Sequence, residues 1–189
     1  GVLASKLRRM DLTPGTWITP SVRLVRPLGS GGMSEVWVAA HMRLHTQVAV
    51  KVLSPGLVAD KNARGRFLRE ARLAARIESP HLVLTYDHGV LSDQRPFIVM
   101  EWLEGESLAR ILDRRRRPLP RLQAIQILEG TCRALAHAHA AGLAHADVKP
   151  GNIFVTRDGT PKLLDFGVAH EVGTEAGGHG HTPQYASPE

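Results

Sequence analysis

The sequence has a single cysteine, few aromatic residues and no hydrophobic run long enough to cross a membrane. Because Cys132 is alone, the chain can form neither an internal disulfide nor a cysteine cluster that would hold a metal. We therefore expect a reducing, cytoplasmic location, with membrane anchoring left open through sequence beyond residue 189. No apolar segment follows the basic residues near the N-terminus, so we expect no secretory signal there.

Positively charged residues exceed negatively charged ones only moderately, with 24 Lys and Arg against 18 Asp and Glu. The densest basic run, 114–117, lies beside two prolines, and no aromatic residue interleaves with it to stack on bases. We interpret this run as a solvated loop and expect no nucleic-acid partner. The 189 residues, 43% of them hydrophobic, suffice for one large domain or two small lobes, and leave the oligomeric state open.

The N-terminal part of the chain is predicted to be rich in strands. Residues 1–20 show no sustained hydrophobic period and contain turn residues, so we expect a leader or a loosely packed extension. An amphipathic helix is predicted over 62–77, where apolar residues recur at spacings of three and four. Strands are predicted at 22–25, 35–39, 47–52, 82–86 and 97–100, the first three forming an antiparallel meander.

A helical part follows, so the chain divides near residue 104 into an N-terminal part (21–104) and a C-terminal part (105–189). Helices are predicted at 108–112 and 122–141, with short strands at 153–155 and 162–164. The apolar stripe of the long helix consists of Ile125, Leu128, Cys132, Leu135 and Ala136.

A glycine-rich segment, 29–34, lies between the first two predicted strands. Glycines there let backbone amides approach a phosphate without an intervening Cβ. The segment alone is weak evidence for a phosphate-binding loop, because in isolation a plain glycine turn in a hairpin is the favoured interpretation. A dinucleotide-binding loop would need a helix after the glycines, whereas the residues that follow are typical of a strand.

Four further motifs carry charged residues. Lys51 lies in the strand-like run Val48-Ala49-Val50-Lys51, and Glu70 on the following helix is its natural partner. After the long helix comes His145-Ala146-Asp147-Val148-Lys149-Pro150-Gly151-Asn152. Asp165-Phe166-Gly167 and Ser187-Pro188-Glu189 complete the series.

The order and spacing of these motifs resemble those of eukaryotic-type serine/threonine protein kinases, and the segment 31–36 is similar to the bacterial branch of that family. The resemblance covers residues 22–189. It implies an α+β, bilobal kinase fold, in which an antiparallel N-lobe sheet with one helix precedes the first part of a helical C-lobe. It also implies transfer of the γ-phosphate of ATP to serine or threonine hydroxyls of a protein substrate.

The resemblance further implies a role for each charged residue of these motifs. Lys51 would contact the α- and β-phosphates, with Glu70 as its ion-pair partner. Asp147 would accept or orient the proton of the substrate hydroxyl. Lys149 would contact the transferred phosphate, which in this family marks serine/threonine rather than tyrosine specificity.

The cofactors implied are ATP and Mg²⁺. Asn152 and Asp165 would hold the metal, because an amide oxygen and a carboxylate suit a hard cation. The positions implied in ATP binding cover the phosphates, border the adenine and form the hinge, with Met100 as gatekeeper. They are Leu28, Gly29, Ser30, Gly31, Gly32, Met33, Ser34, Val36, Ala49, Lys51, Met100, Glu101 and Leu103.

The sequence departs from the family pattern in two respects. Ala146 stands where most of these kinases have an arginine that pairs with a phosphorylated activation segment, so activation through Thr174 lacks its usual receptor. Thr182 would brace Asp147 and Lys149. A family domain also continues beyond Ser-Pro-Glu, so we expect a truncated domain with the stripe of the long helix exposed.

Two alternatives remain open. A nucleotide-binding pseudokinase scaffold or inactive fragment could keep the fold without activity. A small-molecule phosphotransferase of related fold shares the His-x-Asp loop, although it would lack the Ser-Pro-Glu segment. His179 and His181 lie between glycines without a third ligand nearby, and we interpret them as loop residues rather than a metal site.

Overall fold

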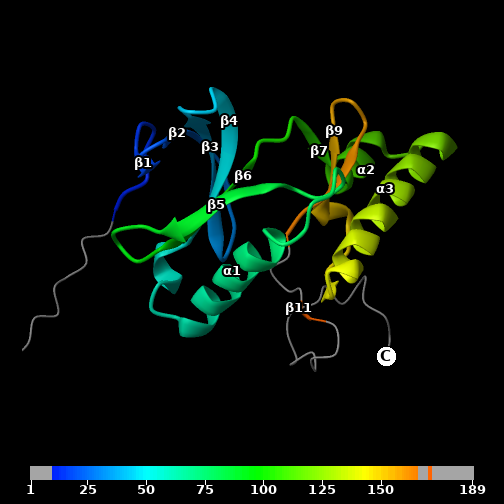
Figure 1. Cartoon of the computed structure of the whole chain (residues 1–189). Coiled ribbons are helices and arrows are strands. Elements are labelled where there is room, and N and C mark those ends of the chain that lie inside the picture. The colour runs from blue at the N-terminus through cyan, green and yellow to red at the C-terminus, as the bar shows by residue number, and fades with distance from the viewer. Residues whose placement is uncertain (1–9, 166–169, 172–189) are drawn as a thin grey trace, which may run out of the picture. The chain divides into compact units, whose positions relative to one another are not determined.

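The computed structural model describes residues 10–165 and 170–171 of the chain (Figure 1). The chain forms two compact units. Unit 1 comprises Gly1–Leu68 and Thr85–Trp102, and unit 2 comprises Arg69–Leu84 and Leu103–Glu189. Residues 69–84 thus group with the C-terminal part, which the expected division near residue 104 did not anticipate.

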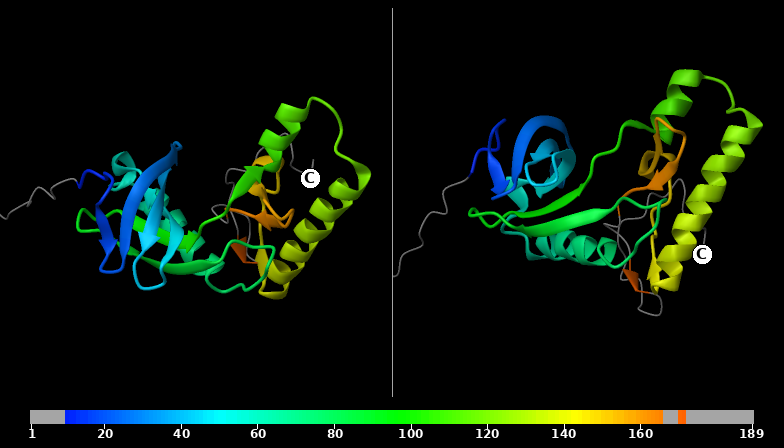
Figure 2. Two further views of the ribbon diagram at one scale, coloured as in Figure 1. Left: turned by 90° about the horizontal axis from the view of Figure 1, so that it is seen from above. Right: turned by 45° about the horizontal axis from the view of Figure 1, so that its top comes forward.

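Unit 1 is built on a six-stranded antiparallel sheet in the order β1-β2-β3-β4-β6-β5, and the sheet curls strongly (Figure 2). Its valine-rich central strand places Val48, Val50 and Val52 in a core with Trp37 and Phe97, as expected for β-branched and aromatic residues on a pleated surface. The predicted meander is confirmed. The strands are β1 (Trp17–Thr19), β2 (Val22–Ser30), β3 (Ser34–His41), β4 (Thr46–Leu53), β5 (Thr85–Val90) and β6 (Pro96–Glu101).

Part of the segment expected to be a leader belongs instead to this sheet. β1 pairs with β2, Ile18 is buried, and Met10 and Leu12 pack against the core. The turn at Gly15 has a positive φ of 93° and hydrogen-bonds to β2 through its amide. Three apolar side chains spaced by turn residues showed no periodicity, so the prediction of a loosely packed extension was wrong for residues 10–20.

Helix α1 (Lys61–Ala74) follows a short 3₁₀ turn, η1 (Pro55–Leu57). Asp60 starts the helix, since its carboxylate accepts the amides of Asn62 at 2.8 Å and Ala63 at 3.1 Å. The predicted helix is confirmed, although it ends three residues early. Beyond Ala74 the backbone tightens into i→i−3 hydrogen bonds that end at Ile77.

The strand predicted at 82–86 is displaced. Leu82 is buried in the core of unit 2 and forms an isolated bridge with Leu163, and the strand begins only at Thr85. The segment 82–86 is therefore divided between the two units. Leu82 packs in the core of unit 2, whereas the residues from Thr85 onward belong to the sheet of unit 1.

Unit 2 combines two helices with short strands. Ser107 caps α2 (Leu108–Arg115) by accepting the Arg110 amide at 3.3 Å, and α3 (Arg121–Ala140) packs on β10 and β8. A three-stranded sheet has the order β10-β9-β7, and β11 pairs with β8. The remaining elements are β7 (Gly105–Ser107), β8 (Leu143–Ala144), η2 (Pro150–Asn152), β9 (Ile153–Thr156), β10 (Pro161–Leu163) and β11 (His170–Glu171).

The stripe predicted on α3 is mostly exposed, as expected, and a different face of the helix packs. The buried residues are small or slender: Ile127, Gly130, Thr131, Ala134 and Ala138. Large residues lie outward, Leu122 being 76% and Leu128 63% exposed. A Cβ at Gly130 would lie 2.2 Å from Pro161 of β10, so a small residue is required where the strand approaches the helix.

Among the described residues, no helix is both long and apolar enough to span a membrane.

Candidate functional site

The glycine segment forms the hairpin between β2 and β3. Gly29 pairs with Val36 and Ser30 with Glu35, and the Gly31 amide donates to the Ser34 carbonyl at 2.8 Å. The Ser54 amide holds the Met33 carbonyl at 2.9 Å, which ties the turn to the end of β4. The segment is thus a hairpin turn in geometry, and a strand follows it, as the sequence indicated.

Nothing in the described fold requires glycine at these positions. A Cβ at Gly29 or Gly32 would meet no atom within 4 Å, and one at Gly31 would meet only the Ser34 oxygen at 3.8 Å. None of the three has a positive φ. Open space beside backbone amides is what close approach by a phosphate needs, so the geometry permits the predicted role.

The β4 and β6 residues expected near an adenine lie directly opposite one another. Ala49 pairs with Met100, and Val48 pairs with Glu101. Ala49 is buried, while Met100 and Glu101 are half-buried. Leu28, on the glycine hairpin, is exposed. The register thus brings the predicted gatekeeper and the predicted adenine neighbour together within unit 1.

Lys51 lies two residues further along β4, between Val36 of β3 and Ile98 of β6. Its half-buried side chain places Nζ 5.9 Å from the ring centroid of Phe67 in α1, a cation–π contact. Glu70 is buried on α1, at 8% exposure. The expected pairing of Lys51 with Glu70 joins residues of the two units and stays a prediction.

Sequence reasoning missed the aromatic surroundings of the predicted hinge. The guanidinium of Arg26 lies 5.8 Å from the ring centroid of Trp102. Burial raises the pKa of Tyr86, and the negative charge of Glu101 raises it further, so this phenol keeps its proton at neutral pH. Leu103 is half-buried and begins the second segment of unit 2.

In unit 2 the predicted catalytic loop is a connected cluster. The Asn152 side chain donates from Nδ2 to the Asp147 carbonyl at 2.9 Å and to the Asp147 carboxylate Oδ2 at 3.0 Å. Lys149 Nζ lies 2.7 Å from the same oxygen. Three residues singled out by the resemblance to protein kinases are therefore in direct contact, and two donors fix the orientation of the Asp147 carboxylate.

A second loop is hydrogen-bonded to this cluster through the backbone. The Leu164 amide donates to the Asn152 carbonyl at 2.8 Å, which places Asp165 next to the loop. Ala146 and Asp165 both adopt positive φ values, 61° and 62°. Non-glycine residues adopt this conformation only when their surroundings impose it, and such residues cluster at functional sites.

His145 links the two loops and was given no role from the sequence. It is 1% exposed, accepts the Asp147 amide at Nδ1 (3.3 Å) and contacts the Leu164 carbonyl through Nε2 (2.8 Å). Because an amide can only donate, Nδ1 is unprotonated and Nε2 carries the hydrogen. Burial lowers the pKa of His145, which outweighs the opposing effects of the Leu164 hydrogen bond and of Asp165 and Asp147. The ring is thus a neutral positioning group.

The donor set of these loops fits a divalent metal that is shared with phosphate oxygens. With Nδ2 engaged by Asp147, the Asn152 side chain presents its oxygen as the remaining hard donor, and Asp165 supplies a carboxylate beside it. Among the described residues, no three His, Cys, Asp or Glu side chains gather into a metal cluster. Two oxygen donors suit a cation that keeps its other positions for substrate and water.

The activation-segment residues Thr174 and Thr182 lie outside the described residues, as do Phe166, Gly167 and the Ser-Pro-Glu motif. Their assigned roles stay predictions.

Comparisons with known proteins agree with the geometry. Residues 22–189 match the protein kinase domain family. The serine/threonine-protein kinase PknB of Mycobacterium leprae is 41% identical over 170 residues, covering 86% of this chain and 27% of its own length. The serine/threonine-protein kinase PknA of Mycobacterium tuberculosis is 40% identical over 183 residues, covering 93% of this chain and 42% of its own length.

A solved structure gives the same picture at the level of the fold. The crystal structure of the Mycobacterium tuberculosis PknI kinase domain superposes with a TM-score of 0.72 at 35% identity, covering 86% of this chain and 65% of that one. The chain thus spans less than half the length of the two curated relatives and about two thirds of a solved kinase domain.

Proposed function

Because this chain belongs to the protein kinase domain family, we propose that it transfers the γ-phosphate of ATP to serine and threonine hydroxyls of protein substrates. The observation that carries the proposal is the contact of Asp147 with Asn152 and Lys149. A carboxylate held by one amide and one ammonium on a short loop is suited to orient a hydroxyl group next to a phosphate.

Each residue has one task in this proposal. Asp147 orients the substrate hydroxyl and receives its proton, while the ammonium of Lys149 balances charge on the transferred phosphoryl group. The backbone amides of the glycine segment and the ammonium of Lys51 bind the phosphates of ATP. His145 holds the Asp147 amide and the Leu164 carbonyl in place.

The metal proposed is Mg²⁺, held by Asn152 and Asp165. When bound, it would neutralise charge on the phosphate oxygens. The magnesium assignment rests on the hardness and small number of the protein donors, because Mg²⁺ characteristically keeps positions for phosphate and water.

The contacts of the catalytic loop favour an enzyme over a scaffold. A protein that only binds nucleotide has no need of the network that orients Asp147, whereas here both a backbone and a side-chain hydrogen bond fix it. Asp147→Asn tests this point, because the amide keeps the shape of the carboxylate and cannot accept the hydroxyl proton.

The experiment measures transfer of labelled γ-phosphate from ATP and Mg²⁺ to a generic serine- and threonine-containing protein, alongside an aminoglycoside. We expect phosphoserine or phosphothreonine with the wild-type chain, and a loss of at least about a hundredfold in kcat for Asp147→Asn with ATP binding retained. Transfer to the aminoglycoside alone would show a small-molecule phosphotransferase, and nucleotide binding without transfer would show a scaffold.

A further inference from the structure

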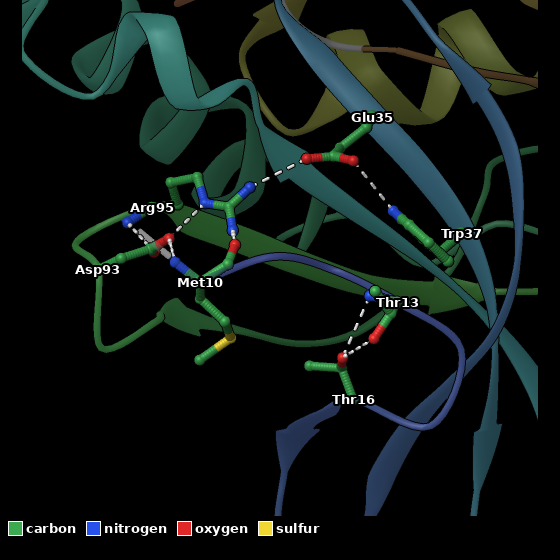
Figure 3. A network of polar contacts seen from close by, with 7 residues as sticks. All are labelled: Met10, Thr13, Thr16, Glu35, Trp37, Asp93 and Arg95. Atoms are coloured by element: carbon green, nitrogen blue, oxygen red, sulfur yellow. Dashed lines mark hydrogen bonds and ion pairs between the residues drawn. The ribbon is translucent and has the colours of Figure 1, made fainter. Parts of the chain in front are cut away.

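A buried arginine in unit 1 donates a hydrogen bond from each of the three nitrogens of its guanidinium. Arg95 lies in the turn between β5 and β6 and is 2% exposed. Its Nε donates to Asp93 Oδ2 at 2.8 Å, its Nη1 to Glu35 Oε1 at 2.9 Å, and its Nη2 to the Met10 carbonyl at 2.5 Å (Figure 3). One side chain therefore joins its own turn to two segments that lie 60 and 85 residues away in sequence.

The first of these segments is held by its backbone. The amide of Met10 donates to Asp93 Oδ2 at 3.0 Å while its carbonyl accepts from Arg95, so both polar groups of this residue are bound by side chains of one turn. Asp93 and Arg95 are themselves paired and buried, which fixes their positions. The side chains of Met10 and Leu12 then pack against the core. Residues 10–12 are thus anchored to the β5–β6 turn.

The other end of the network lies at the base of the glycine hairpin. Glu35 follows Ser34 directly and pairs with Ser30 across the hairpin and with Val52 of β4. Its Oε1 accepts from Arg95 and its Oε2 accepts from the indole nitrogen of Trp37 at 3.3 Å. With both carboxylate oxygens engaged, the residue at which the chain leaves the glycine segment is fixed to the core of the sheet.

Arg95 also balances charge. Two carboxylates, those of Asp93 and Glu35, face this one guanidinium, and Asp93 is as buried as a core residue. Removing the arginine would leave both carboxylates without their partner and release the carbonyl of Met10 at the same time. The segments therefore depend on a shared residue rather than on three independent contacts.

We propose that Arg95 is a positioning residue for nucleotide binding: it couples residues 10–12 to the glycine segment 29–34 and thereby sets the affinity for the phosphates of ATP. The nucleotide part rests on the proposed function above, whereas the coupling rests only on the contacts within unit 1.

Arg95→Lys is the variant of choice, because it keeps the positive charge but donates from a single atom that cannot reach three acceptors at once. The matched control is Arg23→Lys on β2. Arg23 is exposed and lies 5.6 Å from the Trp17 ring centroid, and it makes no contact with Glu35 in the network described. Met10→Pro is a second variant, which removes the amide donated to Asp93 together with the Met10 side chain that packs against the core.

Hydrogen exchange of the nucleotide-free chain gives the first measurement. We expect amides of residues 29–36 to exchange about tenfold faster in Arg95→Lys, the factor expected for losing hydrogen bonds to charged groups, and those in the centre of β4 and β6 to be unchanged. Arg23→Lys should match the wild type. Met10→Pro should shift the same amides in the same direction, which keeps the test decisive if Arg95→Lys does not fold.

The second measurement is steady-state kinetics with ATP. The KM for ATP should rise by about the same factor in Arg95→Lys while kcat changes less than about twofold, because Arg95 reaches no reacting group. A uniform rise in exchange throughout unit 1 with an unchanged KM would reduce Arg95 to a purely structural residue and overturn the proposal. Faster exchange at 29–36 in a chain that binds no ATP would support the coupling and overturn the proposed function instead.

Discussion

The side chain of Asn152 holds Asp147 twice, once at its backbone carbonyl (2.9 Å) and once at its carboxylate (3.0 Å). Asn152 lies five positions after Asp147. The 3₁₀ turn η2 (Pro150–Asn152) brings the chain back so that the side-chain amide of Asn152 reaches Asp147. The Asn152 amide of the backbone also donates to the Lys149 carbonyl at 2.9 Å. The loop is therefore closed on itself by its own hydrogen bonds, which orient the Asp147 carboxylate.

Replacing Asn152 by Asp should break this orientation. The new carboxylate cannot donate, and it would place a second negative charge about 3 Å from the Asp147 carboxylate. We expect kcat to fall by at least about a hundredfold, which corresponds to about 2.7 kcal/mol. Steady-state phosphotransfer checks this, with exposed Asn62→Asp on α1 as the matched control. A variant at residue 152 with wild-type kcat would show that the loop is not held by this contact.

His145 should make the stability of the chain depend on pH. Because folding lowers the pKa of this histidine from 6.5, the unfolded chain binds a proton that the folded chain excludes. Its contribution is fully present above about pH 6.5 and decreases as the pH falls toward the folded pKa, by up to about 1.4 kcal/mol per pH unit. Chemical denaturation without nucleotide from about pH 8 to about pH 5 measures the slope.

The control for this slope is a matched pair of variants. His145→Gln removes the titrating ring and should flatten the pH dependence, even though it also lowers stability at high pH. His88→Gln removes an exposed ring from β5 and should leave the slope of the wild type. Equal slopes in the wild type and in His145→Gln would mean that other groups cause the pH dependence.

The strands and the first helix could be predicted because their signals are local. Alternating valines in β4 and the spacing of apolar residues in α1 act over a few residues, and the strand predicted at 47–52 and the helix predicted at 62–77 are confirmed. The exposure of Leu128 in the apolar stripe of α3 agrees with the prediction, whereas the packed face could not be predicted, because the approach of Pro161 to Gly130 decides it. That approach is set by residues thirty positions away.

The residues of the candidate site also differ in whether the sequence could predict them. The resemblance to protein kinases predicted Asp147 and Asn152, and their contact follows from one short loop. Arg95 was not found, since its three partners lie at residues 10, 35 and 93 and no spacing rule links them. His145 belongs to the motif at 145–152, but its role could not be predicted, because that role depends on burial and on the distant Leu164 carbonyl.

Two glycines in helices should respond to alanine in opposite directions. A Cβ at Gly130 in α3 would lie 2.2 Å from Pro161 and 3.0 Å from His81, so Gly130→Ala should destabilise the chain by about 1 to 3 kcal/mol. A Cβ at Gly65 in α1 would meet nothing within 4 Å, so Gly65→Ala should stabilise it by about 0.5 to 1 kcal/mol. Denaturant unfolding measures both. Stabilisation by both alanines would contradict the close packing of α3 on β10.

Nucleotide binding should raise the thermal midpoint of the chain in a metal-dependent way. Ligand that binds only the folded state, at about a hundred times its Kd, adds about 2.7 kcal/mol, which corresponds to about 5 to 10 °C for a protein of this size. The rise should require ATP and Mg²⁺ together. Asp165→Asn should abolish most of it, because the variant lacks the carboxylate charge and still tolerates the positive φ of 62° at that position.

Asp87→Asn removes the same charge from an exposed residue of β5 in unit 1 and should keep the full rise. A rise in Asp165→Asn equal to that of the wild type would mean that the metal is held elsewhere. If the wild-type chain unfolds cooperatively and its thermal midpoint does not rise at all, the assignment of nucleotide binding to these residues is contradicted. Because the midpoint is measured without a protein substrate, it tests the nucleotide and metal assignments separately from phosphotransfer.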